Sequence, residues 1–176
     1  TARVNPILPR RAALSLGAAL LDAPGVFADE LTRTARQTEG PFYLDKLHLD
    51  TDNDLIVVND RLTPAIGTVA YLSGRIVDSR GEPIRGAVIE IWQADATGIY
   101  LHTRSGDQSK RDAGFQGYGR FLTGSKGEYL FRTLKPTAYT GRTAHIHVKV
   151  RKNGKELLTT ECYVAGEPKN ATDGVL

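Results

Sequence analysis

The sequence predicts an all-β protein, a single mixed β-sandwich with long loops and a short N-terminal segment. Three observations predict this fold. Short runs of alternating β-branched and aromatic residues recur from residue 68 onward, turn residues separate them, and no long amphipathic helix follows residue 40. The 176 residues are enough for one globular domain with a hydrophobic core, and they contain no internal repeat.

The expected strands follow in chain order. We expect them at residues 68–78, 87–93, 120–123, 128–133, 143–151 and 156–164. The stretch 79–83 (Ser-Arg-Gly-Glu-Pro) has the composition of a turn, Gly124-Ser125-Lys126-Gly127 indicates a hairpin, and Asn153-Gly154 indicates a second hairpin more strongly.

Two long stretches do not fit the strand pattern. Residues 97–119 are rich in Gly, Asp, Ser and Gln, and residues 29–67 are also loop-like. Loops of this length in a compact domain tend to carry function. The chain therefore divides into residues 1–28, a loop-rich region at 29–67 that covers a site, and a sandwich at 68–176.

Residues 1–28 have the order of an export signal. Arg10 and Arg11 precede a short apolar stretch, and a small-residue cleavage context ends near Ala28. Paired arginines indicate the twin-arginine type. We expect export to the periplasm or the exterior. The alternative is a retained arm in a cytoplasmic protein, which could pack at a dimer interface and support a homo-oligomer.

Charge and cysteine usage exclude several classes of function. The formal charge of +3 is small, and the densest basic run, residues 149–155, falls at an expected hairpin tip, so we expect no nucleic-acid partner. The apolar stretch near the N-terminus is too short to form a stable membrane span. Cys162 is the only cysteine, which excludes an internal disulfide, and we expect it to be a buried, inert thiol.

His145-Ile146-His147 is the strongest chemical signal. Side chains two apart on a strand share a face, so both imidazoles point to one side while Ile146 and Val148 point to the other. Two imidazoles on one face form half of a metal site. Tyr139 precedes them closely, and a phenolate is a hard anionic donor that suits Fe(III) better than zinc. Two phenolates, two neutral imidazoles and a hydroxide would balance the charge of Fe(III).

A series of motifs in a fixed order runs from residue 37 to residue 168. The motifs are Thr38-Glu39-Gly40-Pro41-Phe42-Tyr43, Gly74-Arg75-Ile76-Val77-Asp78, Gly86-Ala87, Ile91-Trp92-Gln93-Ala94-Asp95, Gly98-Ile99-Tyr100, Phe131-Arg132-Thr133 and Tyr139…Arg142…His145-Ile146-His147. In this order and over this length the chain resembles the intradiol ring-cleavage dioxygenases, which include catechol 1,2-dioxygenases and protocatechuate 3,4-dioxygenases. It resembles most a short, often secreted branch.

The resemblance implies a mononuclear non-haem Fe(III) held by two tyrosinates and two imidazoles, namely Tyr100, Tyr139, His145 and His147. Arg142 matches the arginine that supports the substrate and its developing negative charge. Tyr139 matches the ligand that leaves the metal when a catechol binds, so Tyr139 and Arg142 are the expected catalytic residues. Tyr43 resembles a residue that lines the substrate pocket, and a buried structural tyrosine is the open alternative.

Two features depart from the family pattern. Only five residues separate Tyr139 from His145, where many relatives carry a longer insertion that walls the pocket. We therefore expect a shallower site that accepts substituted catechols. In addition, Glu161 stands where a glutamine that positions substrate is usual. A carboxylate there would repel a catecholate unless it were protonated or paired, for example with Arg142.

The resemblance implies an oxidoreductase that uses O₂ to cleave catechol-type diols between their hydroxyl-bearing carbons, giving cis,cis-muconate-type products. One alternative is a non-catalytic, transthyretin-like β-sandwich binding module, which would have no reason to carry Tyr139 together with the two histidines. The other is a zinc or copper enzyme, which would need a third histidine or a carboxylate rather than two tyrosines.

Overall fold

The structure, a computed structural model, describes residues 32–46, 50–59 and 61–176. The predicted export signal at residues 1–28 lies outside this part of the chain. The described residues contain the strands β1 (Val69–Arg75), β2 (Val88–Trp92), β3 (Tyr118–Leu122), β4 (Glu128–Leu134), β5 (His145–Lys152) and β6 (Lys155–Tyr163), and the short 3₁₀ helices η1 (Gln108–Lys110) and η2 (Pro168–Ala171).

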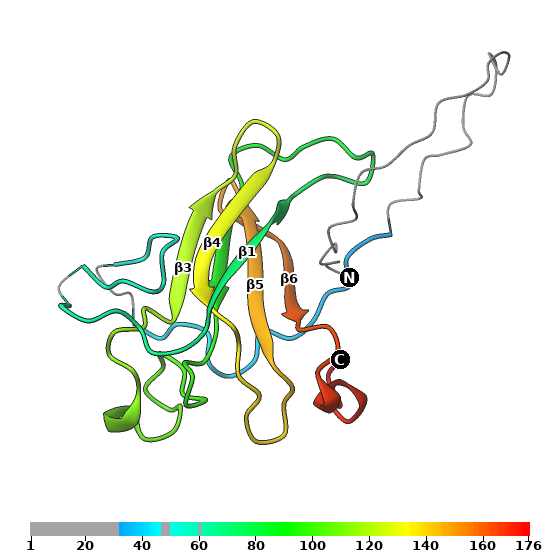
Figure 1. The fold of residues 1–176 in the computed structure, drawn as a ribbon. Helices are drawn as coiled ribbons and strands as arrows, with labels where there is room; N and C mark the ends of the chain where they lie inside the picture. The colour runs from blue at the N-terminus through cyan, green and yellow to red at the C-terminus, as the bar shows by residue number, and fades with distance from the viewer. Residues whose placement is uncertain (1–31, 47–49, 60) are drawn as a thin grey trace, which may run out of the picture.

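The strands form two sheets that face each other, as Figure 1 shows with β1 and β4 in front of the larger sheet. The smaller sheet has the order β1-β4 and the larger sheet has the order β3-β2-β5-β6. The strand pairs are antiparallel, and the parallel contact between Asp54 and Arg132 is an isolated bridge. The predicted β-sandwich is therefore confirmed.

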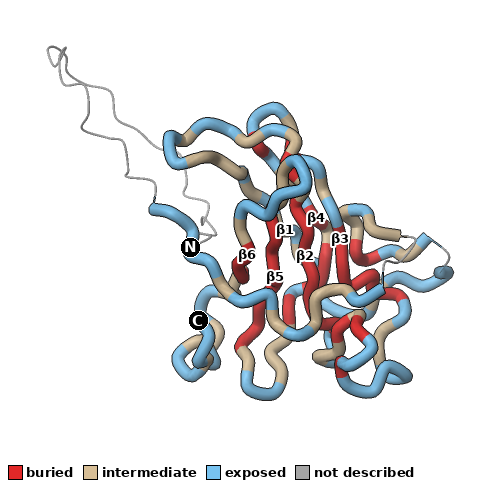
Figure 2. The backbone as a smooth tube through the Cα atoms, turned by 180° about the vertical axis from the view of Figure 1, so that it is seen from behind, coloured by how far each residue is buried: buried red, intermediate tan, exposed pale blue. Residues whose placement is uncertain are grey.

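The hydrophobic core lies between the two sheets, where Figure 2 shows the buried centres of the strands. On β5, Ile146, Val148 and Val150 point into this core, as alternation along a strand requires. They pack with residues from β2, β4 and the loop before β1, including Ile89, Ile91, Phe131, Leu134 and Leu55.

The other face of the large sheet is also buried, and this face positions the site. All six residues from His145 to Val150 are buried, so both sides of β5 are covered. A second cluster forms here from Trp92, Ala94, Tyr100 and Tyr118, against which Phe42, Tyr43, Leu44, Leu101 and Tyr139 pack. The covering residues come from the loops before β1, between β2 and β3, and between β4 and β5.

The two predicted hairpins have different outcomes. The turn at Asn153 and Gly154, with φ of 50° and 76°, joins the paired strands β5 and β6 as expected. The prediction of a hairpin at residues 124–127 was wrong. The turn exists, but β3 pairs with β2 while β4 pairs with β1, so the chain crosses there from one sheet to the other. A local turn signal does not specify which strand each arm will pair with.

Two further expectations need correction. Lys149, placed in a solvated basic tip by the sequence, is 4 % exposed because its position on β5 puts it on the same face as His145 and His147. Cys162, expected to be buried, is partly buried against the core, and burial raises the pKa of its thiol.

Within the described residues, no helix has the length and apolar character needed to span a membrane.

Candidate metal centre

His145 and His147 present their Nε2 atoms to each other at 3.2 Å, and each ring has a partner on its far side. His145 Nδ1 lies 2.7 Å from the carbonyl oxygen of Thr143. Because a carbonyl only accepts hydrogen bonds, Nδ1 of His145 carries the proton and Nε2 keeps a free lone pair. This is the tautomer that a metal-binding imidazole needs.

His147 occupies the middle of a row across three strands. It pairs in register with Trp92 of β2 on one side and with Glu161 of β6 on the other. The Trp92 ring stacks on the imidazole at 4.8 Å with an interplanar angle of 3°. Nδ1 faces Glu161 Oε1 at 3.5 Å, longer than an ordinary hydrogen bond, and neither atom has another partner. A carboxylate opposite Nδ1 favours the proton there and leaves Nε2 free.

Tyr100 reaches the two histidines from the loop that follows β2. The buried carboxylate of Asp95 shapes this loop by accepting hydrogen bonds from the backbone N–H groups of Thr97, Ile99 and Asp112. Gly98, at φ +86°, completes the turn. The Tyr100 side chain is almost fully buried, and its hydroxyl lies 3.2 Å from Nε2 of His145.

Tyr139 comes from the turn before β5, where its backbone pairs with that of Arg142. Its hydroxyl lies 3.3 Å from the Tyr100 hydroxyl, and its ring packs edge-to-face on Tyr100 at 5.6 Å. It is half-buried, whereas Tyr100, His145 and His147 are buried. Tyr139 is thus the member of the group that is open to an approaching molecule.

Four donor atoms from two loops and one strand therefore converge: the hydroxyls of Tyr100 and Tyr139 and Nε2 of His145 and His147. If both imidazoles carry their protons on Nδ1, two lone pairs face each other at 3.2 Å, which is unfavourable without a cation between them. Burial lowers the pKa of His145, and burial together with the neighbouring His145 and Arg142 lowers the pKa of His147 to about 3. Both rings are therefore neutral and able to bind a metal ion.

The two phenols are neutral when no metal ion is bound. Burial raises the pKa of Tyr100, and the neighbouring Tyr139 adds to this effect. Burial also raises the pKa of Tyr139. A phenolate would form at this site only with a cation to stabilise it, so the residues fit a metal ion that displaces both protons.

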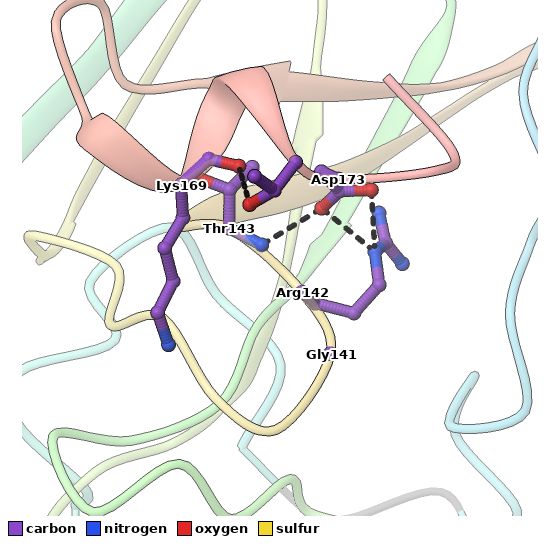
Figure 3. A pocket seen from close by; sticks show the side chains of 6 residues that line it. Gly141, Arg142, Thr143, Lys169 and Asp173 are labelled. Carbon is purple, nitrogen blue, oxygen red and sulfur yellow. Dashed lines mark hydrogen bonds and ion pairs between the residues drawn. The ribbon is translucent and has the colours of Figure 1, made fainter.

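Arg142 lies between two buried carboxylates. Its Nη2 pairs with Glu161 Oε2, and its Nε lies 3.1 Å from Asp173 Oδ2. Figure 3 shows Arg142 and the backbone nitrogen of Thr143 turned toward Asp173. Outside this contact is a pocket of about 210 Å³ lined by Gly141, Arg142, Thr143, Lys169, Thr172 and Asp173.

Tyr43 packs against the cluster that contains Tyr100, but its hydroxyl does not contact the four donor atoms. Its hydroxyl donates to Glu90 at 3.2 Å and its ring packs edge-to-face on Trp92 at 4.9 Å. Its neighbour Phe42 instead stacks on Tyr100 at 5.1 Å. A contact between Tyr43 and substrate stays a prediction. The contacts with Glu90 and Trp92 support the alternative, a structural role for Tyr43.

A second donor set overlaps the first. His145, His147 and Glu161 each offer an atom within 4.8 Å of the others, which is enough to hold a cation of another type. Glu161, however, is already engaged by Arg142 and by the Tyr163 hydroxyl at 2.6 Å. The two tyrosines have no such competing charge partner, so the set with two tyrosines fits a metal ion better.

From the sequence we expected no role at the site for Asp173, Tyr163, Trp92 or Gly40. The first two reach Arg142 and Glu161, and Gly40 lies so close to His147 that an added Cβ would stand 3.3 Å from Cε1. Trp92 and Gly40 both belong to motifs of the family resemblance, but the role of Trp92 depends on the register that sets it beside His147. These roles follow from the strand register and from the packing of the loops, which are properties of the folded chain and leave no local pattern in the sequence.

Comparison with known proteins gives one consistent result. The family described as Dioxygenase matches residues 38–175. The chain is 33 % identical to the protocatechuate 3,4-dioxygenase beta chain of Burkholderia cepacia, over 70 % of this chain and 56 % of that protein. It is 28 % identical to the catechol 1,2-dioxygenase of Candida albicans, over 89 % of this chain and 55 % of that protein. It therefore spans about half the length of these curated relatives.

The fold agrees with solved structures. The dioxygenase domain of a dioxygenase carbohydrate-binding protein fusion from Streptomyces sp. SirexAA-E superposes with a TM-score of 0.64 at 34 % identity and 82 % coverage of both chains. An intradiol ring-cleavage dioxygenase from Tetranychus urticae gives a TM-score of 0.57 at 29 % identity, covering 73 % of this chain and 63 % of that one. The chain belongs to the intradiol ring-cleavage dioxygenase family.

Proposed function

We propose that this protein is an O₂-dependent intradiol dioxygenase that cleaves catechol-type diols to cis,cis-muconate-type products at a non-haem Fe(III). The observation that carries the proposal is the convergence of two hydroxyls and two imidazole nitrogens, with Nδ1 of each imidazole facing an acceptor. Two phenolates are hard donors that favour a trivalent cation over zinc. Family membership supports the same chemistry.

In this proposal Tyr100, Tyr139, His145 and His147 hold the ion. When bound, ferric iron would supply the Lewis-acid and redox chemistry that makes a deprotonated catechol reactive toward O₂. The Thr143 carbonyl and the stacked Trp92 ring fix the two imidazoles, which reduces the reorganisation needed at the site.

Proton transfer falls to Tyr139. A catechol has to lose two protons to bind through both oxygens. The half-buried Tyr139 hydroxyl is the group of the four that an approaching diol can reach, so Tyr139 would take one proton, and the hydroxide that completes the charge balance of Fe(III) would take the other and leave as water. Burial raises the pKa of Tyr139, so its oxygen takes up a proton readily once it is no longer held as a phenolate. Tyr139 thus acts as a base that substrate displaces.

The covering loops keep water from the remaining donors. Phe42 stacks on Tyr100 and Gly40 packs against His147, so the segment before β1 closes the site from one side. Nη2 and Nε of Arg142 are engaged, and Nη1 has no hydrogen-bond partner among the described residues, so Nη1 can donate to a substrate oxygen. These contacts orient a planar diol between Tyr139 and Arg142.

The test is a ring-cleavage assay on iron-loaded protein. We expect catechol to consume one equivalent of O₂ and give a product with muconate-type ultraviolet absorption. The Tyr100→Phe variant should lose this activity, because it removes one buried oxygen donor. A protein that turns over with zinc, or a Tyr100→Phe variant with unchanged activity, would favour the His145, His147 and Glu161 donor set instead.

A further inference from the structure

The carboxylate of Glu161 lies between the proposed metal ligand His147 and the proposed substrate-binding residue Arg142. One oxygen, Oε1, faces Nδ1 of His147 at 3.5 Å, and the other, Oε2, pairs with Nη2 of Arg142 and accepts from the Tyr163 hydroxyl at 2.6 Å. Its backbone N–H donates to Gln37 Oε1 at 3.0 Å. The side chain has no exposed surface, so this carboxylate is held in one place.

Asp173 holds the other side of the same guanidinium. Its two oxygens lie 3.3 and 3.1 Å from Nε of Arg142, and they also accept the backbone N–H groups of Val175 and Thr143 at 2.9 and 2.7 Å. Burial would raise the pKa of Asp173, but these hydrogen bonds and Arg142 bring it to about 2. Asp173 is therefore ionised at neutral pH.

Arg142 is consequently not a free positive charge. Burial alone would lower its pKa, but its bonds to Glu161 and Asp173 raise it above the ordinary value, so it remains charged. Two carboxylates and one guanidinium leave a net charge of −1 beside the donor atoms. In a buried site this charge acts at short range with little screening by water.

We propose that Glu161, with Asp173, is a specificity-determining residue that neutralises Arg142 and so excludes diols carrying an anionic ring substituent. Glu161 is also a positioning residue, because its second oxygen fixes the His147 ring. The inference rests on the proposed function. Arg142 still donates a hydrogen bond from Nη1, but the cluster repels a carboxylate on the substrate where a lone arginine would attract it.

The experiment compares Glu161→Gln with Glu156→Gln in the full-length, iron-loaded protein. Both variants remove one charge from β6, but Glu156 is 40 % exposed, and its partners are Arg36 and, at 3.8 Å, Lys149 rather than Arg142 or His147. Dissociation constants for 3,4-dihydroxybenzoate and 4-methylcatechol are measured without O₂ from the change in visible absorption. The quantity of interest is the ratio between the two probes.

We expect the native protein and Glu156→Gln to bind the carboxylated probe at least tenfold more weakly than the methyl probe. Glu161→Gln should narrow the ratio of the two dissociation constants at least fivefold, because only the carboxylated probe should bind more tightly. Asp173→Asn should narrow the ratio also. An unchanged ratio in both variants, or a native preference for the carboxylated probe, overturns the inference while the proposed function stands. Absence of iron and of any visible change on adding 4-methylcatechol counts instead against the proposed function.

Two further readouts separate positioning from simple structural support. Glu161→Gln should lose iron to a chelator several-fold faster than Asp173→Asn, because only Glu161 faces His147. In ¹⁵N-labelled protein as purified, which needs no added iron, the Nε–H signal of Arg142 should exchange with water at least tenfold faster in Asp173→Asn than in Glu156→Gln. Equal iron loss, or equal exchange of this signal, contradicts the arrangement on which the inference depends.

Discussion

His147 is placed by its neighbours as much as by its own strand. Trp92 stacks on one side of the ring, Glu161 faces the Nδ1 atom, and Gly40 lies against the ring edge. The spacing of the two histidines predicted that they share a face, and the structure places them so. The neighbours could not be predicted, because the register between β2, β5 and β6 depends on packing of the whole sheet.

His145→Ala should abolish iron binding. His145 contributes a neutral Nε2 whose tautomer is fixed by the Thr143 carbonyl, and this atom lies 3.2 Å from both the Tyr100 hydroxyl and Nε2 of His147, so alanine removes the central buried donor of the set. Iron content after purification and dialysis is the measurement, and we expect at least a tenfold loss. Retention of full iron content and colour would show that the ligand assignment is wrong.

Tyr139→Phe should behave differently. The half-buried Tyr139 is the proposed displaceable base, so its loss leaves three donors that are already buried and takes away the group that receives a substrate proton. We expect iron to be retained while kcat falls about a hundredfold with a smaller change in KM. Equal loss of iron in Tyr139→Phe and His145→Ala would argue against separate roles.

Asp173 should make part of the stability depend on pH. Its pKa is about 2 in the folded protein against an ordinary value of 3.8, so its contribution is fully present above pH 3.8 and is lost as the pH falls through about 2. Urea unfolding with a chelator present measures the difference between native protein and Asp173→Asn. The difference should be larger at pH 6 than at pH 2, and a difference independent of pH would contradict the assignment.

At the scale of elements, residues 36–45 form a strap across the site-bearing face of the large sheet. Gln37 N donates to Thr159 O at 3.0 Å, Lys149 pairs with Glu39, and Lys149 Nζ lies 4.0 Å from the centre of the Tyr43 ring. The sequence predicted the covering role of this loop from its length and composition. The buried lysine that helps to fasten the strap was missed, because a basic run was expected to face solvent.

Gly40→Ala tests the fit of this strap. Gly40 has φ +70°, and an added Cβ would lie 3.3 Å from Cε1 of His147. Gly154→Ala is the matched control, because Gly154 has φ +76° and no atom within 4 Å of an added Cβ. Both variants should lose about 1 kcal/mol in the free energy of unfolding. Only Gly40→Ala should also lose iron faster to a chelator, and equal iron loss would contradict the contact.

In the molecule as a whole, one face of the large sheet packs in the core and the other face carries the candidate metal centre. Ile146, Val148 and Val150 fill the core between the sheets, while the histidines face the loops. Alternation along β5 predicted this division. The assignment of β3 and β4 to different sheets could not be predicted from Gly124 and Gly127, because a turn constrains only a few residues while sheet membership depends on long-range packing.

Removal of iron should destabilise the entire fold. The four donors come from β5 and from two separate loops, so an ion that binds them stabilises only the folded chain. We expect a chelator to lower Tm by several degrees in the native protein and to leave Tm of His145→Ala unchanged. The same decrease in both proteins would mean that the ion is bound elsewhere.

One visible spectrum of the pure protein, recorded with its metal content before and after anaerobic addition of catechol, tests directly whether two tyrosines and two histidines hold ferric iron. Two tyrosinates on ferric iron absorb visible light, whereas zinc sites do not. We expect about one iron per chain, a red-brown protein, and a changed band on adding catechol. Stoichiometric zinc and a colourless protein, even after careful supplementation with iron, would contradict this expectation.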